Sequence, residues 1–273
     1  MYIGIGLPSH IAHVPGPLTV EWARRAEQRG FAGLAAIDRL VYESHDSIVA
    51  LSAAAGATTD IGLTTNVLLA PLYPAALLAK QVTTLADISG GRLTLGLGVG
   101  SRPDDYTAVG VDYRRRGRIL DETVAVLRDK ADTETGIPIL FGGRADATIR
   151  RAATIGDGWT AGALREYTNQ CVLADRIRAA WAAAGRPGRP WLQASVNFTL
   201  GDRDTVDAGR AHLQSYYGFK PDYAALNIAD MITSPQDAAQ TVHAYRDLGF
   251  DGLVFHPCVA DIDQVDRLAD GVL

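Results

Sequence analysis

The chain has 273 residues, of which 47% are hydrophobic, and its formal net charge is −5 at pH 7. Acidic and basic residues are interspersed, so the sequence lacks the basic surface expected of a protein that binds nucleic acid or an anionic membrane. Two cysteines, Cys171 and Cys258, make neither a disulfide framework nor a metal-binding spacing. The first ten residues lack the basic and apolar regions of a signal peptide. We therefore expect a soluble, cytoplasmic protein.

Eight short apolar runs alternate with helical patterns, which is typical of repeated βα units around a parallel sheet. The runs lie near residues 2–7, 33–38, 61–68, 93–99, 137–142, 157–161, 191–200 and 251–256. Eight such units close a barrel. The sequence thus predicts an α/β protein, a (β/α)8 TIM barrel that forms a single domain over residues 1–273 with short insertions at the carboxyl-terminal rim.

Polar side chains follow the first two runs, at the rim where barrel enzymes carry their active sites. Gly4 and Gly6 leave one face of the first strand bare, and His10 comes just after it. His10 is a candidate catalytic residue, with an exposed loop histidine as the alternative. Asp38 and Arg39 end the second run, where they can orient a ring or its substrate, or form a local ion pair that supports the loop.

The stretch from residue 61 to residue 102 predicts a strand, a turn, a helix, a tight turn and a second strand. In the second strand Gly96, Gly98 and Gly100 alternate with large apolar residues, so one face is nearly bare. Such a face indicates either close packing inside a barrel or the approach of a ligand. The amides after Gly98 could hold a phosphate, with Arg102 supplying charge. A dinucleotide fingerprint is excluded, because the third glycine is missing and Pro103 follows.

A second glycine pair, Gly142 and Gly143, joins the fifth run to a helix that opens at Asp146. Glycines before a helix N-terminus favour anion binding, because free amides and the helix dipole point the same way. We therefore favour a phosphate site over a plain tight turn. In the next run Trp159 is most simply a core residue.

The last two runs place further polar side chains at the barrel interior. By parity Gln193, Ser195 and Asn197 share the inward face of the seventh run and must be hydrogen-bonded to each other, to water or to a ligand. Asn197, nearest the rim, is a candidate cofactor contact. His256 ends the eighth run and points inward, as either a catalytic or a structural histidine.

The connections predict helices near residues 18–30, 116–128, 166–184, 203–216 and 235–248. Between the last two lies an aromatic segment, residues 216–223, which could line a substrate pocket or form an oligomer contact. A short polar link from Asp129 to Gly136 precedes the fifth run.

Several segments resemble the luciferase-like monooxygenase superfamily of flavin- and deazaflavin-dependent (β/α)8 enzymes. The matching segments are Thr65-Asn66-Val67, Pro74 with Ala79-Lys80-Gln81, Leu85 to Arg92, Gly98-Val99-Gly100, Gly110 to Tyr113, Arg116-Gly117-Arg118 and Asp121-Glu122. Weaker matches extend the resemblance over most of the chain. It implies a non-prolyl cis peptide between Asn66 and Val67, behind the central ring of the cofactor. It also implies cofactor contacts from the following residues: Gly98, Val99, Gly100, Ser101, Gly142, Gly143, Arg144 and Trp159.

Three features depart from the pattern of that family. Arg39 stands where the deazaflavin branch often has a histidine implicated in proton handling, so the role of a general acid or base is not carried over to it. Ser101 stands where an acidic residue frequently follows the glycine loop, and the link after residue 128 is shorter than the insertion that shapes the substrate pocket in relatives. A more open site is expected.

The resemblance implies an oxidoreductase that transfers hydride between coenzyme F420 and a small organic substrate, with Asp38, Arg39, His256 and His10 near the reacting atoms. FMN is the alternative cofactor. A deazaflavin carries hydride only, whereas reduced FMN activates oxygen, so FMN would indicate a monooxygenase. A non-catalytic flavin-binding barrel is a second alternative. A metal-dependent isomerase or hydrolase is disfavoured, because the sequence lacks a clear His and carboxylate constellation. We expect a homodimer.

Overall fold

The fold is a closed barrel of eight parallel strands, which pair in sequence order, with β8 returning to β1. It is seen in a computed structural model that describes residues 1–130 and 136–273. The strands are β1 (Tyr2–Gly6), β2 (Gly33–Ala36), β3 (Gly62–Leu68), β4 (Leu93–Leu97), β5 (Ile139–Gly142), β6 (Gly158–Thr160), β7 (Trp191–Phe198) and β8 (Gly252–Pro257). Each predicted run matches one strand to within two residues at either end, so the predicted barrel is confirmed.

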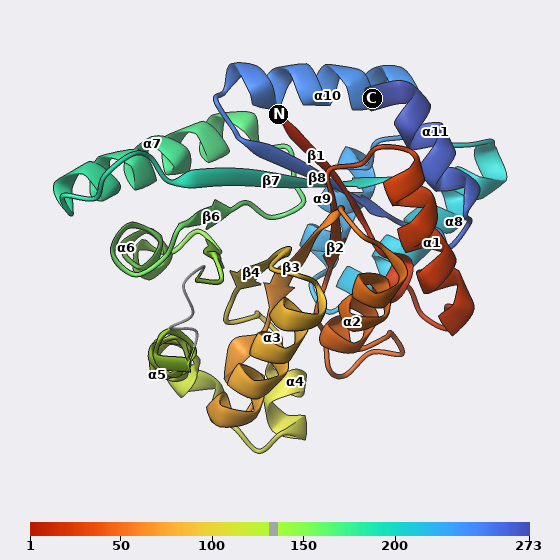
Figure 1. Cartoon of the computed structure of the whole chain (residues 1–273). Coiled ribbons are helices and arrows are strands. Elements are labelled where there is room, and N and C mark those ends of the chain that lie inside the picture. The colour runs from red at the N-terminus through yellow and green to blue at the C-terminus, as the bar shows by residue number, and fades with distance from the viewer. Residues whose placement is uncertain (131–135) are drawn as a thin grey trace.

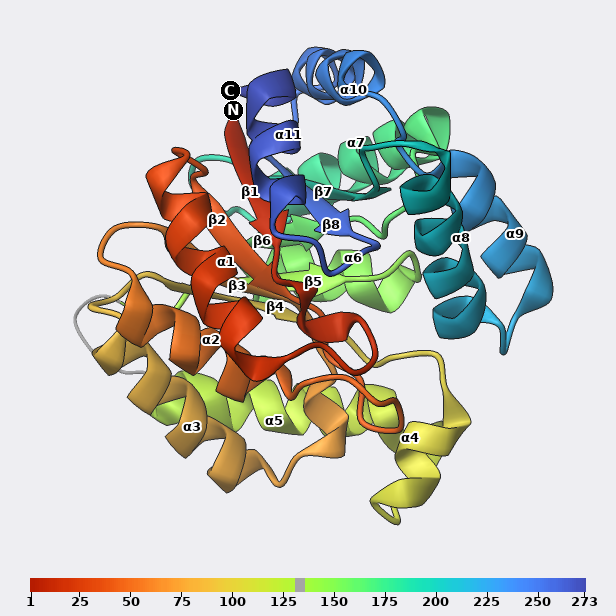
Figure 2. The ribbon, with the colours of Figure 1, turned by 90° about the vertical axis from the view of Figure 1, so that its right-hand side faces the viewer.

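Helices cover the outside of the barrel, and the two chain ends lie close together (Figures 1 and 2). The helices are α1 (Gly16–Gln28), α2 (Ser47–Ala57), α3 (Ala75–Ile88), α4 (Pro103–Ala108), α5 (Arg116–Lys130), α6 (Asp146–Thr154), α7 (Tyr167–Ala183), α8 (Arg203–Tyr217), α9 (Pro221–Asp230), α10 (Pro235–Asp247) and α11 (Asp263–Val272). The aromatic segment is more regular than predicted: α8 ends at Tyr217, and Pro221 opens α9, because proline suits the first turn of a helix. Most of the link from Asp129 to Gly136 lies outside the described residues.

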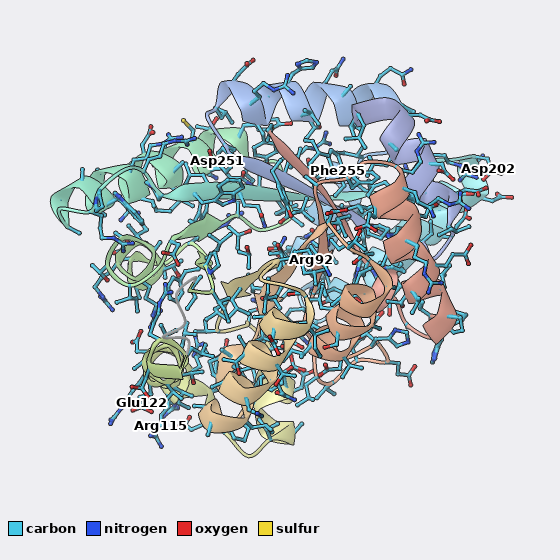
Figure 3. The ribbon with its side chains drawn as sticks, viewed as in Figure 1. Arg92, Arg115, Glu122, Asp202, Asp251 and Phe255 are labelled. Carbon is cyan, nitrogen blue, oxygen red and sulfur yellow. The ribbon has the colours of Figure 1, made fainter. Side chains whose placement is uncertain are left out.

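The amino-terminal end of the barrel is tied together by charged side chains that bind the main chain. Arg92, labelled in Figure 3, donates hydrogen bonds to the carbonyl oxygens of Ala55 and Ile61 at 3.0 and 2.9 Å. Asp251 accepts a hydrogen bond from the Leu192 amide at 2.9 Å, just before β8 begins. These contacts satisfy main-chain groups at one end of the strands and leave the carboxyl-terminal end for a site.

The bare face of β4 is covered by a bulge in β3. A Cβ at Gly96 would lie 2.2 Å from the Thr65 carbonyl oxygen, and one at Gly98 would lie 2.6 Å from Val67 Cγ2. The β3–β4 register shifts between Thr65 and Leu68, and the peptide bond between Asn66 and Val67 is cis, as predicted. Glycine is therefore required at positions 96 and 98 first of all because the β3 bulge packs closely against them. The bulge also brings the Val67 side chain to the barrel mouth.

None of the helices in the part of the chain that the structure describes combines the length and the apolar character needed to cross a membrane.

Candidate active site

A cavity of about 370 Å³ opens at the carboxyl ends of the strands. Pockets that hold small ligands and cofactors typically measure about 300–1,000 Å³. Residues at or just after seven strands, β2 to β8, line it, together with aromatic residues of the α8–α9 segment. The predicted site residues that line it are Asp38, Arg39, Asn66, Val67, Gly98, Val99, Gly100, Ser101, Gly142, Gly143 and His256.

Val67 forms an apolar platform within this lining. A Cβ at Gly142 would lie 2.8 Å from Val67 Cγ1, and one at Gly98 would lie 2.6 Å from Cγ2 of the same side chain. Gly98, just after β4, and Gly142, at the end of β5, thus make room for the bulge in β3. The bulge in turn presents the Val67 side chain to the cavity. Such a surface suits the face of a planar ring.

Beside the platform lies a hydrogen-bonded polar group centred on Asn66. Its amide nitrogen donates to Ser195 Oγ at 2.7 Å, and its amide oxygen accepts from Thr160 Oγ1 at 3.0 Å. His256 Nε2 lies 3.2 Å from the same amide nitrogen. The inward polar face predicted for β7 is present, because Ser195 bonds across the barrel to Asn66 of β3 and Gln193 donates to Thr160 of the neighbouring strand β6.

His256 is an uncharged imidazole. Burial and then the neighbouring His10 lower the pKa of His256 to about 3, so it stays neutral at ordinary pH. A Cβ at Gly6 would lie 2.5 Å from its Nδ1 atom, so the bare face of β1 is occupied by this ring. His256 can therefore supply a neutral polar contact at the cavity wall.

His10 lies behind that wall and does not belong to the lining. It is 3% exposed, and its Nδ1 atom is 3.2 Å from the Leu7 carbonyl oxygen. Its ring packs against those of His212 and His256, with centroid separations of 5.3 and 5.9 Å. Among the described residues, no group of three His, Cys, Asp or Glu side chains is placed to hold a metal ion. The structure thus puts His10 in contact with His256 and outside the cavity lining.

Asp38 is buried at the end of β2 and holds the segment that follows β3. Its carboxylate accepts hydrogen bonds from the Leu69 amide at 2.9 Å and from the Tyr73 hydroxyl at 3.1 Å. Burial raises the pKa of Asp38 to about 6, and these two hydrogen bonds oppose the rise. The alternative of a local ion pair between Asp38 and Arg39 is not seen in the described chain. Arg39 instead pairs with Asp104 and donates to the carbonyl oxygens of Tyr216 and Val41.

The loop after β5 has the backbone that the phosphate interpretation requires. Gly143 has φ +123°, a conformation that side chains rarely adopt, and a Cβ there would lie 3.0 Å from Thr148 Oγ1 in the first turn of α6. No described side chain caps that helix. The Thr148 amide donates to the Ala145 carbonyl oxygen at 2.8 Å, so the amides that precede Thr148 are the ones that can face an anion.

Three predicted cofactor contacts lie outside the cavity lining. Trp159 is 1% exposed and donates from Nε1 to the Gly143 carbonyl oxygen at 2.8 Å, so it holds the loop from behind. Arg144 pairs with Glu166 at the surface. Asn197 donates to Asn227 Oδ1 at 3.0 Å and ties β7 to α9.

Sequence patterns did not single out several lining residues. These are Ile37, Leu69, Asp105, Thr160, Ala161, Gly162 and Ala163. Leu69 follows the bulge and Asp105 lies in α4, a helix without a periodic signal of its own. The aromatic segment lines the cavity through Tyr216, Tyr217, Phe219 and Tyr223, which favours the pocket alternative over an oligomer contact.

The family model described as luciferase-like monooxygenase matches residues 3–246. The chain belongs to this family. An uncharacterized protein of Mycobacterium tuberculosis is 38% identical over an alignment of 135 positions, which covers 41% of this chain and 46% of that protein. The 5,10-methylenetetrahydromethanopterin reductase of Methanolobus tindarius is 32% identical over 126 residues, 45% of this chain and 38% of that enzyme. The matches thus span about half or less of these relatives.

Solved structures share the luciferase-like fold over nearly the whole chain. An F420-dependent secondary alcohol dehydrogenase, solved with an F420-acetone adduct, is 18% identical with a TM-score of 0.82, covering 99% of this chain and 97% of that one. A monooxygenase from Streptomyces bottropensis is 18% identical with a TM-score of 0.77, covering 99% and 96%. At this identity the likeness concerns the fold.

Proposed function

We propose that the protein is an F420-dependent oxidoreductase that transfers hydride to or from a small organic substrate in the cavity. The observation that carries the proposal is the Val67 platform, packed on Gly98 and Gly142, in a pocket whose lining also includes the Gly143 loop. A planar ring fits the platform, and a phosphate fits the loop, where a side chain would not. F420 is favoured by the TTNVLL and GLGVG segments and by the F420-dependent structural neighbour.

When bound, the deazaflavin supplies the carbon that donates or accepts hydride. The protein holds the two reacting carbons in contact and excludes water. The aromatic residues Tyr216, Tyr217 and Phe219 line the cavity and help to exclude water. Asp38 can carry a proton at its carboxyl group near pH 6, and neutral His256 can orient a polar group of the substrate.

Titration of the purified protein with F420 and with FMN, followed by ring fluorescence, tests the choice of cofactor. We expect F420 to bind at least about tenfold more tightly than FMN. Val67→Glu should abolish binding by placing a charge on the platform, whereas Val172→Glu, on the exposed side of α7, should leave it unchanged. Tight binding of FMN alone would instead indicate a monooxygenase. Binding of neither would contradict the proposal.

We also propose that the protein is a cytoplasmic homodimer. Both cysteines are free thiols, which suits a reducing compartment. The α2 segment SIVALSAAAGA contains no charged residue, yet Val49 is 65% exposed. Leu77 of α3, which packs beside α2 (Figure 2), is 52% exposed. A helix that is apolar on every side is usually covered, and a second copy would cover this face.

The double variant Val49→Glu with Leu77→Glu should therefore be monomeric at concentrations where the native protein is a dimer, because four glutamates would meet in the contact. Light scattering coupled to size exclusion measures this. Val172→Glu serves as the control, since it adds a charge at another exposed valine. A monomeric native protein would remove the dimer proposal without touching the proposed activity.

A further inference from the structure

Two arginines form one wall of the cavity. Arg39 follows β2 and Arg102 follows β4, and both belong to the lining. Their side chains are only 5% and 15% exposed. Burying a guanidinium costs free energy unless it is paired, so two in one wall need an explanation.

Stacking fixes the orientation of both guanidinium groups. The Arg102 Cζ atom lies 3.9 Å from the centroid of the Phe219 ring. The Arg39 Cζ atom lies 4.7 Å from the Tyr42 centroid and 5.3 Å from the Tyr216 centroid. Ring contacts on the flat faces leave the in-plane N–H groups for hydrogen bonding. Both arginines donate to one acceptor, the Tyr216 carbonyl oxygen, at 3.3 Å each.

The two side chains also converge on one carboxylate. Arg102 donates to Asp104 Oδ2 at 2.8 Å, and the Arg39 guanidinium lies 3.7 Å from the same oxygen. The Asp104 side chain is 45% exposed, far more than either arginine. The Asp104 carboxylate therefore reaches the two guanidinium groups from the solvent side. It can rotate into water without disturbing the packing of Arg39 and Arg102.

Arg39 is buried and not fully hydrogen-bonded. Burial first, and then the neighbouring Arg102, lower the pKa of Arg39, and the carboxylates of Asp104 and Asp105 do not cancel that effect. Its Nε atom is buried without a hydrogen-bond partner in the described residues. The wall thus offers at least one unused donor, the Arg39 Nε–H group, beside two guanidinium groups.

We propose that Arg39 and Arg102 bind an anionic group of the substrate, a carboxylate or a phosphate ester, which displaces the resident carboxylate of Asp104. The proposal rests on the proposed function, because it names the substrate class of the same site. A planar, two-pronged arginine contact suits both anions. The Gly143 loop after β5 remains the site proposed for the cofactor phosphate.

Succinate and its uncharged diamide are matched probes for this site. Calorimetric titrations are made on the apo protein and on the protein loaded with cofactor, and the cofactor Kd is measured separately by ring fluorescence. We expect succinate to bind at least about tenfold more tightly than the diamide. Arg102→Gln should weaken succinate binding about ten- to a hundredfold, and Arg102→Lys less. The cofactor Kd should not change.

Asp104→Asn provides a test of opposite sign. Removing the competing carboxylate should tighten succinate binding about three- to tenfold, a gain that a misfolded variant cannot imitate. Arg118→Gln is the net-charge control for Arg102→Gln, because both variants remove one positive charge. Arg118 is 74% exposed and pairs with Glu122 on α5, so its replacement should leave succinate binding unchanged.

Equal affinity for the two probes, no binding of either, or no effect of Arg102→Gln and Asp104→Asn would overturn the proposal. A raised cofactor Kd in Arg102→Gln would also overturn it, because the arginines would then hold the cofactor. Failure of the native protein to bind any ring cofactor would contradict the proposed function instead, while the apo titrations would still decide the anion site.

Discussion

Gly143→Val should raise the Kd for the cofactor by about a hundredfold, while the protein still folds. Gly143 has φ +123°, and a Cβ there would lie 3.0 Å from Thr148 Oγ1. A valine is therefore strained at this φ and crowds the Thr148 side chain, and we expect the loop to shift relative to the first turn of α6, where the phosphate is proposed to bind. The left-handed backbone should also cost about 1–2 kcal/mol of unfolding free energy. Ring fluorescence measures the Kd, and urea unfolding measures the stability.

Gly110→Val is the matched control for this loop. Gly110 has φ +68°, a Cβ there would meet no atom within 4 Å, and the residue does not line the cavity. Its replacement should cost similar stability and leave cofactor affinity unchanged. If Gly143→Val bound cofactor as the native protein does, the phosphate would have to lie elsewhere.

Asp38→Asn and His256→Ala should each lower turnover by about ten- to a thousandfold without abolishing it. Hydride transfer belongs to the cofactor, and neither residue is placed as an essential base. His256 is already neutral, and the Asp38 carboxylate is engaged by Leu69 and Tyr73. The kcat of each variant is compared with that of His243→Ala, an exposed histidine of α10. Complete loss of turnover with intact fold and cofactor affinity would make the residue an obligatory acid or base.

The Asp38→Asn variant should also change how stability depends on pH. The folded-state pKa of about 6 lies above the ordinary value of 3.8, so the folded protein binds the proton more tightly than the unfolded chain does. Unfolding free energy should fall as pH rises through this window, by up to about 3 kcal/mol. An asparagine side chain cannot titrate, so the difference in stability between native protein and variant should change over the same window. Denaturant unfolding at pH 4.5 and pH 7 measures it. A pH-independent difference would mean that the pKa of Asp38 is not raised.

Local sequence was sufficient for the barrel. Alternating apolar and helical periodicity marked all eight strands, since a parallel strand must bury a short apolar run whatever its neighbours are. The glycine pattern of β4 and β5 identified the two loops of the cavity, because only glycine tolerates the close approach of Val67 or the backbone of Gly143. Parity alone placed Ser195 and His256 at the barrel interior.

Sequence did not separate the residues that face the cavity from those one layer behind it. Trp159 and Asn197 were grouped with the cofactor contacts, yet Trp159 supports Gly143 from behind and Asn197 binds Asn227. Thr160, next to Trp159, and Ser195, two residues before Asn197, do line the cavity. The difference depends on which way a strand end turns and on which helix packs over it, and neither is a property of the local segment.

The sequence by itself determined the barrel and the glycine loops, because each depends on residues a few positions apart, whereas the cis peptide between Asn66 and Val67 was implied only by the family resemblance. Only the tertiary structure decided the chemistry of the polar groups. Asp38 has a raised pKa because the fold buries it, and its carboxylate is held by Leu69 and Tyr73, 31 and 35 residues away. Arg39 meets the Tyr216 carbonyl 177 residues away. Desolvation and long-range hydrogen bonds set charge states, and both exist only after the chain has closed into a barrel.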